Sequence, residues 1–180
     1  MSAPYWIDAF EDLVDAVRAD TDNPGTGNEP YFMHGHPLEI VDRLNQKDRD
    51  KTYKFQKYPV IVLFQDFPEE VGQDMTIRSE GTFNLIIAKD TSADYNASER
   101  YTNTFRPVLY PLYDLLMKHI QRSGLFKNVT AGLTPHTKTD RLFWGREGLY
   151  GNEGNIFNDR IDAIEIDNLI LQMKITKNCI

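Results

Sequence analysis

The feature of this sequence that most constrains its fold is an alternation of residue types between Met75 and Ile87. Apolar or small residues occupy the odd positions, and polar residues occupy most of the even ones. Because successive side chains of a strand point to opposite faces of a sheet, the pattern predicts a half-buried strand whose odd face is core. The preceding run Tyr58–Phe64 is β-branched and aromatic. It predicts a buried strand, antiparallel to the first, with residues 66–74 as the turn.

Three segments have the sequence pattern of helices. Between Trp6 and Ala19, apolar residues follow one helical face and acids the other. A short helix is expected from near Pro37. Asn96, with Glu99 three residues later, has the pattern of a capping box. It predicts the start of a long helix that Gly124 ends.

Two places interrupt these regular patterns. Pro107 and Pro111 lie inside the long helical pattern, so we expect either a kink or a restart with Pro111 in the first turn. In the last predicted strand, Ile161 to Ile175, the buried-type residues are even-numbered up to 166 and odd-numbered from 169. A slip of one residue near Asp167 and Asn168 is the signature of a β-bulge.

These elements predict an α+β fold in a single domain over residues 1–180. We expect a mostly antiparallel sheet of about four strands, with helices packed mainly on one face. Residues 142–144 are expected to form a short edge strand. The stretch 21–57 opens with turn-forming residues and continues with runs of charge. We therefore expect an extended loop or arm there, which becomes ordered on a neighbouring protein.

Composition excludes several classes of protein. Twenty-seven acids against twenty bases give a formal charge of −7, which disfavours a protein whose main task is to bind phosphates. The one cysteine, Cys179, has no partner for a disulfide, and no run of 18 apolar residues suits a membrane span. The first eight residues lack the pattern of a signal peptide. We therefore expect assembly in a cytosol and no membrane contact.

A search for catalytic or cofactor patterns finds none that outweighs an ordinary structural explanation. The glycines form neither a phosphate-binding loop nor a dinucleotide fingerprint. His34 and His36 have a spacing that suits a metal on a strand, but a turn with exposed histidines is favoured. Asp66 and Lys89 suggest a metal nuclease, yet Ile87 stands where that site needs an acid. We expect no enzyme activity, no cofactor and no metal.

The charges are arranged in blocks of opposite sign. Six bases fall between Arg43 and Lys57, where Tyr53 and Phe55 are interleaved with them, and acids without a base follow from Asp66 to Asp74. Bases with aromatics suit single-stranded nucleic acid, but lysines beside a strand also protect sheet edges. We favour a structural or interface role for this run over nucleic-acid binding.

The order of elements resembles that of the tail-terminator or tail-completion proteins at the neck of tailed bacteriophages. That family opens with an amphipathic helix, followed by a strand of the Tyr58-Pro59-Val60-Ile61 type. A second strand and a long helix come next, here near Asn96 to Ser123. An aromatic segment, here Leu142 to Gly145, precedes a last strand with an acid-rich start, here Asn158 to Ile166. The likeness spans roughly residues 5 to 176 and lies in pattern and order.

The resemblance implies a structural virion protein that caps the tail tube as a ring, by family resemblance a hexamer, and joins it to the head connector. Its partners would be other copies of itself, the tail tube protein and the connector, and DNA would cross the lumen without sequence-specific binding. A ring formed by head-to-tail contacts requires two different surfaces. We expect an interface of opposite charges between copies, with Arg49, Lys51 and Lys54 against Asp66, Glu69 and Glu70 or against the acids of the first helix. The alternatives are another neck component or a small cytosolic nucleic-acid-binding protein.

Overall fold

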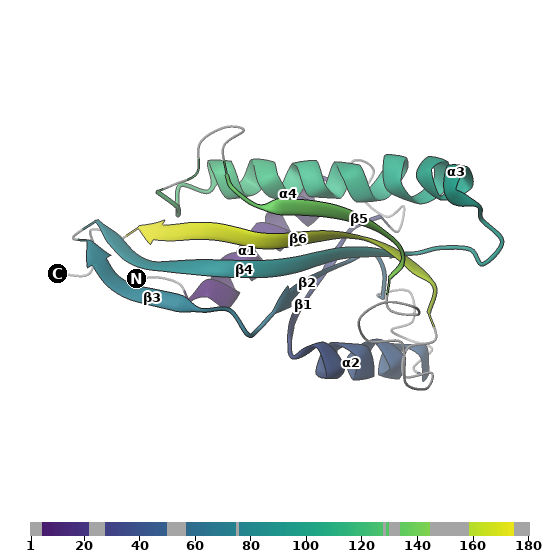
Figure 1. Ribbon diagram of the computed structural model, residues 1–180, viewed down its shortest axis with the longest axis horizontal. Helices are drawn as coiled ribbons and strands as arrows, with labels where there is room; N and C mark the ends of the chain where they lie inside the picture. Colours follow the sequence, from purple (N-terminus) through teal and green to yellow (C-terminus); the bar gives the residue numbers. More distant parts are fainter. Residues whose placement is uncertain are drawn as a thin grey trace.

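The structure, a computed structural model, describes residues 5–21, 28–49, 57–74, 76–127, 129, 134–144 and 159–174. One mixed sheet forms the centre of the molecule (Figure 1). The elements in chain order are α1 (Trp6–Ala19), β1 (Tyr31–Gly35), α2 (Pro37–Arg49), β2 (Val60–Phe64), β3 (Glu69–Asp74), β4 (Ile77–Asp90), α3 (Ala97–Arg100), the π-helical segment η2 (Tyr101–Leu109), α4 (Tyr110–Arg122), β5 (Thr137–Trp144) and β6 (Ile161–Lys174).

The predicted α+β class is confirmed, but the sheet has six strands instead of about four. The strand order is β1-β2-β4-β6-β5, and β3 pairs with β4 beside that path. β2 is antiparallel to β4, as expected, whereas β1 and β2 are parallel. The parallel pair exists because α2 carries the chain back across one face of the sheet before β2 begins.

The two strands that were not expected come from segments interpreted as a turn and as an arm. Residues 66–74 include the edge strand β3, which pairs antiparallel with the first half of β4. Within 21–57, Tyr31–Gly35 forms β1, and the short helix expected near Pro37 is α2. Residues 28–49 are therefore part of the domain and not an extended arm. Residues 22–27 and 50–56 lie outside the described part of the chain.

The larger core lies between the sheet and the helices α1 and α4. The odd face of β4 is buried as predicted, with Phe83, Leu85 and Ile87 fully buried. The Phe83 ring lies 4.6 Å from the ring of Trp6 and 5.0 Å from that of Phe10, centroid to centroid. These contacts fix the first turn of α1 against the middle of the sheet.

The predicted bulge in β6 is confirmed. Phe83 pairs with Leu169 and Leu85 pairs with Ile166, so two residues of β6 lie opposite one residue of β4. Asn168 is the irregular residue, with φ of 56°, and its N–H donates to the Asn84 side-chain oxygen at 3.0 Å. Asparagine tolerates this left-handed conformation better than most residues. The bulge keeps both halves of β6 buried on the same face.

The capping box at Asn96 and Glu99 is also confirmed, and both of its hydrogen bonds are present. The long helix continues from α3 through η2 into α4. Pro107 lies within the π-helical segment, and Pro111 stands in the first turn of α4, as one of the two expected outcomes has it. Proline removes one backbone donor, and a wider turn accommodates that loss.

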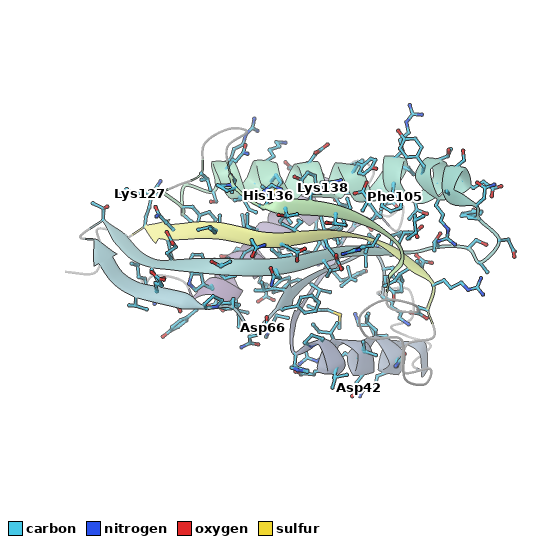
Figure 2. The ribbon with its side chains drawn as sticks, in the orientation of Figure 1. Asp42, Asp66, Phe105, Lys127, His136 and Lys138 are labelled. Atoms are coloured by element: carbon cyan, nitrogen blue, oxygen red, sulfur yellow. The ribbon has the colours of Figure 1, made fainter. Side chains whose placement is uncertain are left out.

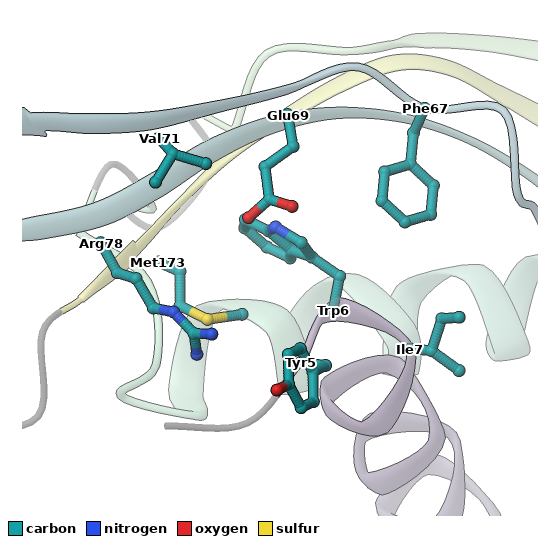
Figure 3. A pocket seen from close by; sticks show the side chains of 8 residues that line it. All are labelled: Tyr5, Trp6, Ile7, Phe67, Glu69, Val71, Arg78 and Met173. Atoms are coloured by element: carbon teal, nitrogen blue, oxygen red, sulfur yellow. The ribbon is translucent and has the colours of Figure 1, made fainter. Parts of the chain in front are cut away.

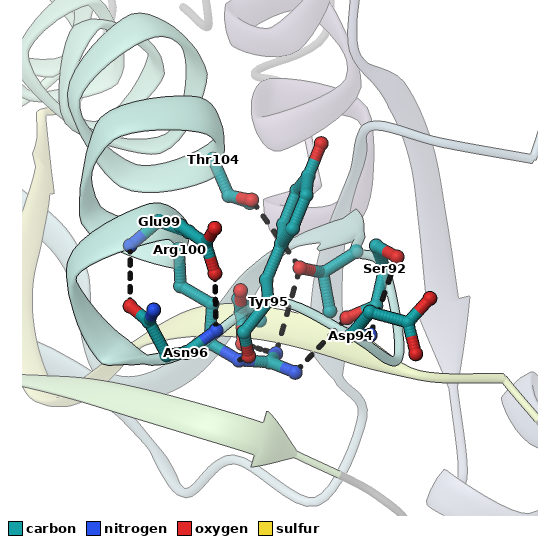
Figure 4. Close-up of polar contacts among 9 residues, drawn as sticks. Ser92, Asp94, Tyr95, Asn96, Glu99, Arg100 and Thr104 are labelled. Atoms are coloured by element: carbon teal, nitrogen blue, oxygen red, sulfur yellow. Dashed lines mark hydrogen bonds and ion pairs between the residues drawn. The ribbon is translucent and has the colours of Figure 1, made fainter.

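A buried ion pair joins the start of the long helix to the sheet. Arg100 Nη1 lies 2.8 Å from Asp162 Oδ1, and the two side chains are 1% and 0% exposed. The same guanidinium donates to the backbone carbonyls of Tyr95 and Ser92, both at 3.1 Å (Figure 4). One side chain thus connects β6, the loop after β4 and the first turn of α3.

Helices cover the sheet mainly on one face, as expected, but not only there. α1 and α4 lie on one side, and α2 lies on the other (Figure 1). The smaller core under α2 includes Ile40, Val41 and Leu44, whereas Leu38 of the same helix is 52% exposed. The two cores share one sheet, so the described residues form one packed unit.

Candidate interaction surface

The acidic half of the expected interface lies along one exposed edge of the sheet. Asp66 follows β2, and Glu69 and Glu70 begin β3; all three side chains are exposed. Figure 2 shows Asp66 between β3 and α2. Among the described residues β3 pairs only with β4. An edge strand rich in acids resists uncontrolled pairing while leaving a surface for a chosen partner.

The basic half cannot be placed in the same way. Arg49 is the last residue of α2, and its side chain lies outside the described residues, as do Lys51 and Lys54 entirely. Asp66, Glu69 and Glu70 therefore lie along the same edge of the sheet, with the side chains of Glu69 and Glu70 on opposite faces of β3. The expected pairing of these acids with the three bases remains a prediction.

A cavity of about 430 Å³ opens beside the acidic edge (Figure 3). Its wall is mostly apolar and comes from the start of α1, the segment before β3, β3 itself, β4 and the end of β6. The residues that the structure brings together here include Tyr5, Trp6, Phe67, Val71 and Met173. Two charged side chains, Glu69 and Arg78, also line the cavity. Its size is within the range of sites that bind small molecules or anchor side chains.

Trp6 carries a buried polar atom without a partner at this site. Its side chain is 4% exposed, yet the indole Nε1 has no hydrogen-bond acceptor among the described residues. In Figure 3 the ring lies beneath the Glu69 side chain. Buried tryptophan N–H groups usually have an acceptor, because burying an unpaired donor costs free energy. An occupant that supplies an acceptor would recover this loss.

The rim of the cavity exposes large apolar side chains. Tyr5 is 70% exposed and Val71 is 73% exposed. The Arg78 guanidinium lies over the Tyr5 ring, 5.5 Å from its centroid. Aromatic, aliphatic and arginine side chains around a hollow are the composition that protein interfaces favour. No local pattern in the sequence points to this site, because its walls come from segments that are far apart along the chain.

Two described bases of the basic run, Lys47 and Lys57, belong to the fold. Lys57 is buried, forms an ion pair with Asp159 and lies beside Tyr58, whose hydroxyl donates to the same carboxylate. Lys47 lies over the Tyr31 ring. Burial, with nearby Arg18 and Lys57, lowers the pKa of Lys47. These contacts agree with a structural role for this part of the run.

The histidines make local contacts. His34 Nδ1 lies 3.1 Å from the Gln65 side-chain oxygen, and His36 Nδ1 accepts from the backbone N–H of Leu38. Within the described ranges, no group of three or more His, Cys, Asp or Glu side chains is placed to hold a metal ion.

A second polar cluster, which the sequence did not indicate, lies between α4 and β5. The Tyr113 hydroxyl lies 2.7 Å from His136 Nε2, and His136 Nδ1 lies 2.8 Å from the Thr134 carbonyl. Because a carbonyl only accepts, Nδ1 carries a proton. Burial raises the pKa of Tyr113. The cluster holds β5 against the helix.

Comparison with known proteins adds no relative: no protein-family model matches the chain, and no curated protein sequence does. No helix within the described residues has the length and apolar character needed to cross a membrane.

Proposed function

We propose that this chain is a structural protein of the neck of a tailed bacteriophage. In this proposal it caps the end of the tail tube as a ring, most simply a hexamer, and presents its other face to the head connector. Its partners are other copies of itself, the tube protein and connector proteins, and it acts in the virion. The support is the order of elements described above together with a surface suited to protein contacts.

The observation that carries the proposal is the acidic edge strand with an apolar cavity beside it. Asp66 and Glu69 supply charge at the edge, and Tyr5 and Val71 supply exposed apolar surface at the rim of the cavity. Exposed ion pairs contribute only about 0.2–1 kcal/mol each. Apolar burial therefore has to supply the affinity, while charge sets register and rate of association. The surface combines both.

A ring also requires a second, different surface on each copy. The basic run supplies opposite charge, and the ends of the segment between Arg49 and Lys57 lie at the other end of the sheet from β3 (Figure 1). A basic surface at one end of the sheet and an acidic surface at the other suit a head-to-tail contact that closes into a ring. A net charge of −7 also suits a lumen that DNA crosses without binding.

The test is electron microscopy of phage tails assembled with the protein. Wild-type protein should form rings on the tube ends. Reversal of two bases, Lys51→Glu with Lys54→Glu, should block capping at moderate salt without lowering the melting temperature of the monomer. The matched control reverses the exposed bases Arg106 and Arg122 to Glu, which gives the same change in net charge on the long helix.

Two results would count against the proposal. Normal caps formed by the Lys51→Glu, Lys54→Glu protein would show that this charge block has no part in the ring. A strictly monomeric protein on wild-type tail ends would remove the ring altogether. A monomer that instead retards DNA in a gel would favour the nucleic-acid-binding alternative.

A further inference from the structure

The cavity beside β3 has the features of a receptor for one side chain. It is about 430 Å³ in volume, its wall is mainly apolar, and one buried donor, Trp6 Nε1, lacks an acceptor among the described residues. Glu69 and Arg78 in its wall carry opposite charges, and Asp66, next to the wall residue Phe67, adds a negative charge. The best occupant is an aromatic side chain that carries a hydrogen-bond acceptor and is flanked by bases.

The chain itself contains such a segment. Tyr53 has a hydroxyl oxygen that can accept from an indole N–H, and Lys51 and Lys54 flank it closely. Phe55, the other aromatic residue of the run, has no acceptor. This segment lies outside the described residues, but its neighbour Lys57 is fixed by the ion pair with Asp159.

Covalent geometry excludes insertion of Tyr53 into the cavity of its own chain. Glu69, at the cavity, pairs with Gly81, whereas the start of β6 pairs with Asp90. Those positions of β4 are about 30 Å apart at the rise of a strand. Four residues of chain reach at most about 14 Å, which is less than half of that separation. The remaining gap is longer than a tyrosine side chain.

We propose that the cavity beside Trp6 receives the side chain of Tyr53 from a neighbouring copy of this chain, while Lys51 and Lys54 of that copy face Asp66 and Glu69. The contact rests on the proposed ring, because it identifies the residues that join one copy to the next. Trp6 donates to the Tyr53 hydroxyl, and the ring of Tyr53 packs on the apolar wall. Burying an aromatic anchor in a pocket is how most interfaces gain affinity.

The experiment measures binding of a labelled synthetic peptide, with the sequence of residues 49–57, to the full-length Tyr53→Ala chain by fluorescence anisotropy. Because this chain lacks the Tyr53 side chain, no copy can occupy the cavity of another copy. The cavities are therefore open to the peptide. We expect saturable binding at one site per chain. A peptide with Tyr53→Ala should bind about tenfold or more weakly, and one with Tyr53→Phe about three- to tenfold more weakly. A peptide with Phe55→Ala is the matched control.

The receptor side is tested by a charge reversal at the cavity. Glu69→Lys in the full-length chain should weaken binding, and Asp42→Lys, an exposed acid of α2 under the other face of the sheet, should leave it unchanged. Melting temperatures establish that each variant is folded. If the Tyr53→Ala chain is unstable, the Lys51→Glu, Lys54→Glu chain serves as receptor. Absence of saturable binding, or equal binding of the Tyr53→Ala peptide, overturns the contact.

Different results would refute the proposed contact and the proposed function. Specific peptide binding by a protein that does not cap tails would retain the contact and remove the proposed function. Normal capping by the Tyr53→Ala chain would remove the contact and leave the proposed function in place.

Discussion

The ion pair between Arg100 and Asp162 offers the sharpest test of the fold. Asp162→Asn keeps the shape of the side chain but removes the charge opposite a guanidinium that is 1% exposed. At an effective dielectric constant of about 20, two unit charges about 4 Å apart attract by about 4 kcal/mol. Removing one partner of a buried pair costs about 3–5 kcal/mol in measured cases. We therefore expect the free energy of unfolding to fall by that amount.

Urea unfolding checks this magnitude, since a lower midpoint at constant slope reports lost stability. For a chain of this size the melting temperature should fall by about 6–20 °C. Arg100→Met should lower the free energy of unfolding by a similar amount. The double variant Arg100→Met, Asp162→Leu should lose much less than the sum of the single changes, because neither charge is then buried alone. Glu165→Gln, which breaks the exposed pair with Arg141 on the same strand, is the control and should have little effect.

A near-normal Asp162→Asn protein would refute this reasoning. So would single effects that simply add in the double variant. Either outcome would mean that the pair is solvated, and that the start of the long helix is not fixed to β6 in the way the structure shows.

Three further predictions concern β4 and β6. Asn84→Ala removes the acceptor of the Asn168 N–H in the bulge and should cost about 1 kcal/mol in urea unfolding, with no change if the bulge is absent. Gly81→Ala would push a Cβ into the Phe83 ring and should lower stability by about 1–3 kcal/mol, whereas a neutral effect would mean that this ring lies elsewhere. Burial, then the charge of Glu165, raises the pKa of Asp167 above its ordinary 3.8, with Arg141 acting in the opposite direction. Folding thus favours the protonated form of Asp167. The stabilisation of the folded state that this gives is present below pH 3.8 and is lost as pH rises. Asp167→Asn should therefore melt higher than wild type at neutral pH and alike in acid; the opposite order would contradict the pKa direction.

Elements whose burial follows a regular period could be predicted from the sequence. The odd residues of β4 are buried from Ser79 to Ile87, so alternation alone identified the strand. The change of phase at Asp167 and Asn168 located the bulge for the same reason, since a slip of one residue reverses the faces. The capping box at Asn96 depends only on contacts three residues apart. Local geometry determines each of these features.

β1 and β3 could not be predicted because neither has a clear period. β3 is rich in acids and is exposed at each described side chain, so its sequence has the pattern of a polar turn. It is a strand because β4 extends beyond β2 and leaves an edge with which β3 can pair. β1 is short and follows turn-forming residues, and it gains its place by pairing with β2. Both depend on contacts between distant segments.

The candidate site also has one part that the sequence predicted and another that it could not predict. Charge patterning pointed to Asp66, Glu69 and Glu70, because a run of acids without bases stays exposed. It could not point to Trp6, which the sequence indicated only as the first residue of an amphipathic helix. Its unpaired N–H has meaning only once β3 and the end of β6 lie over the start of α1. The donor and its cavity are products of the tertiary fold.

The positions of the two surfaces also bear on how copies join. A two-fold pair that set the acidic edge of one copy directly against that of the other would bring like charges together, and like charges repel. In the proposed contact, Lys51 and Lys54 of one copy face Asp66 and Glu69 of the next, so opposite charges meet between copies. Each copy would then offer one cavity and one anchor. Such an arrangement propagates head to tail, and a constant rotation per copy closes it into a ring.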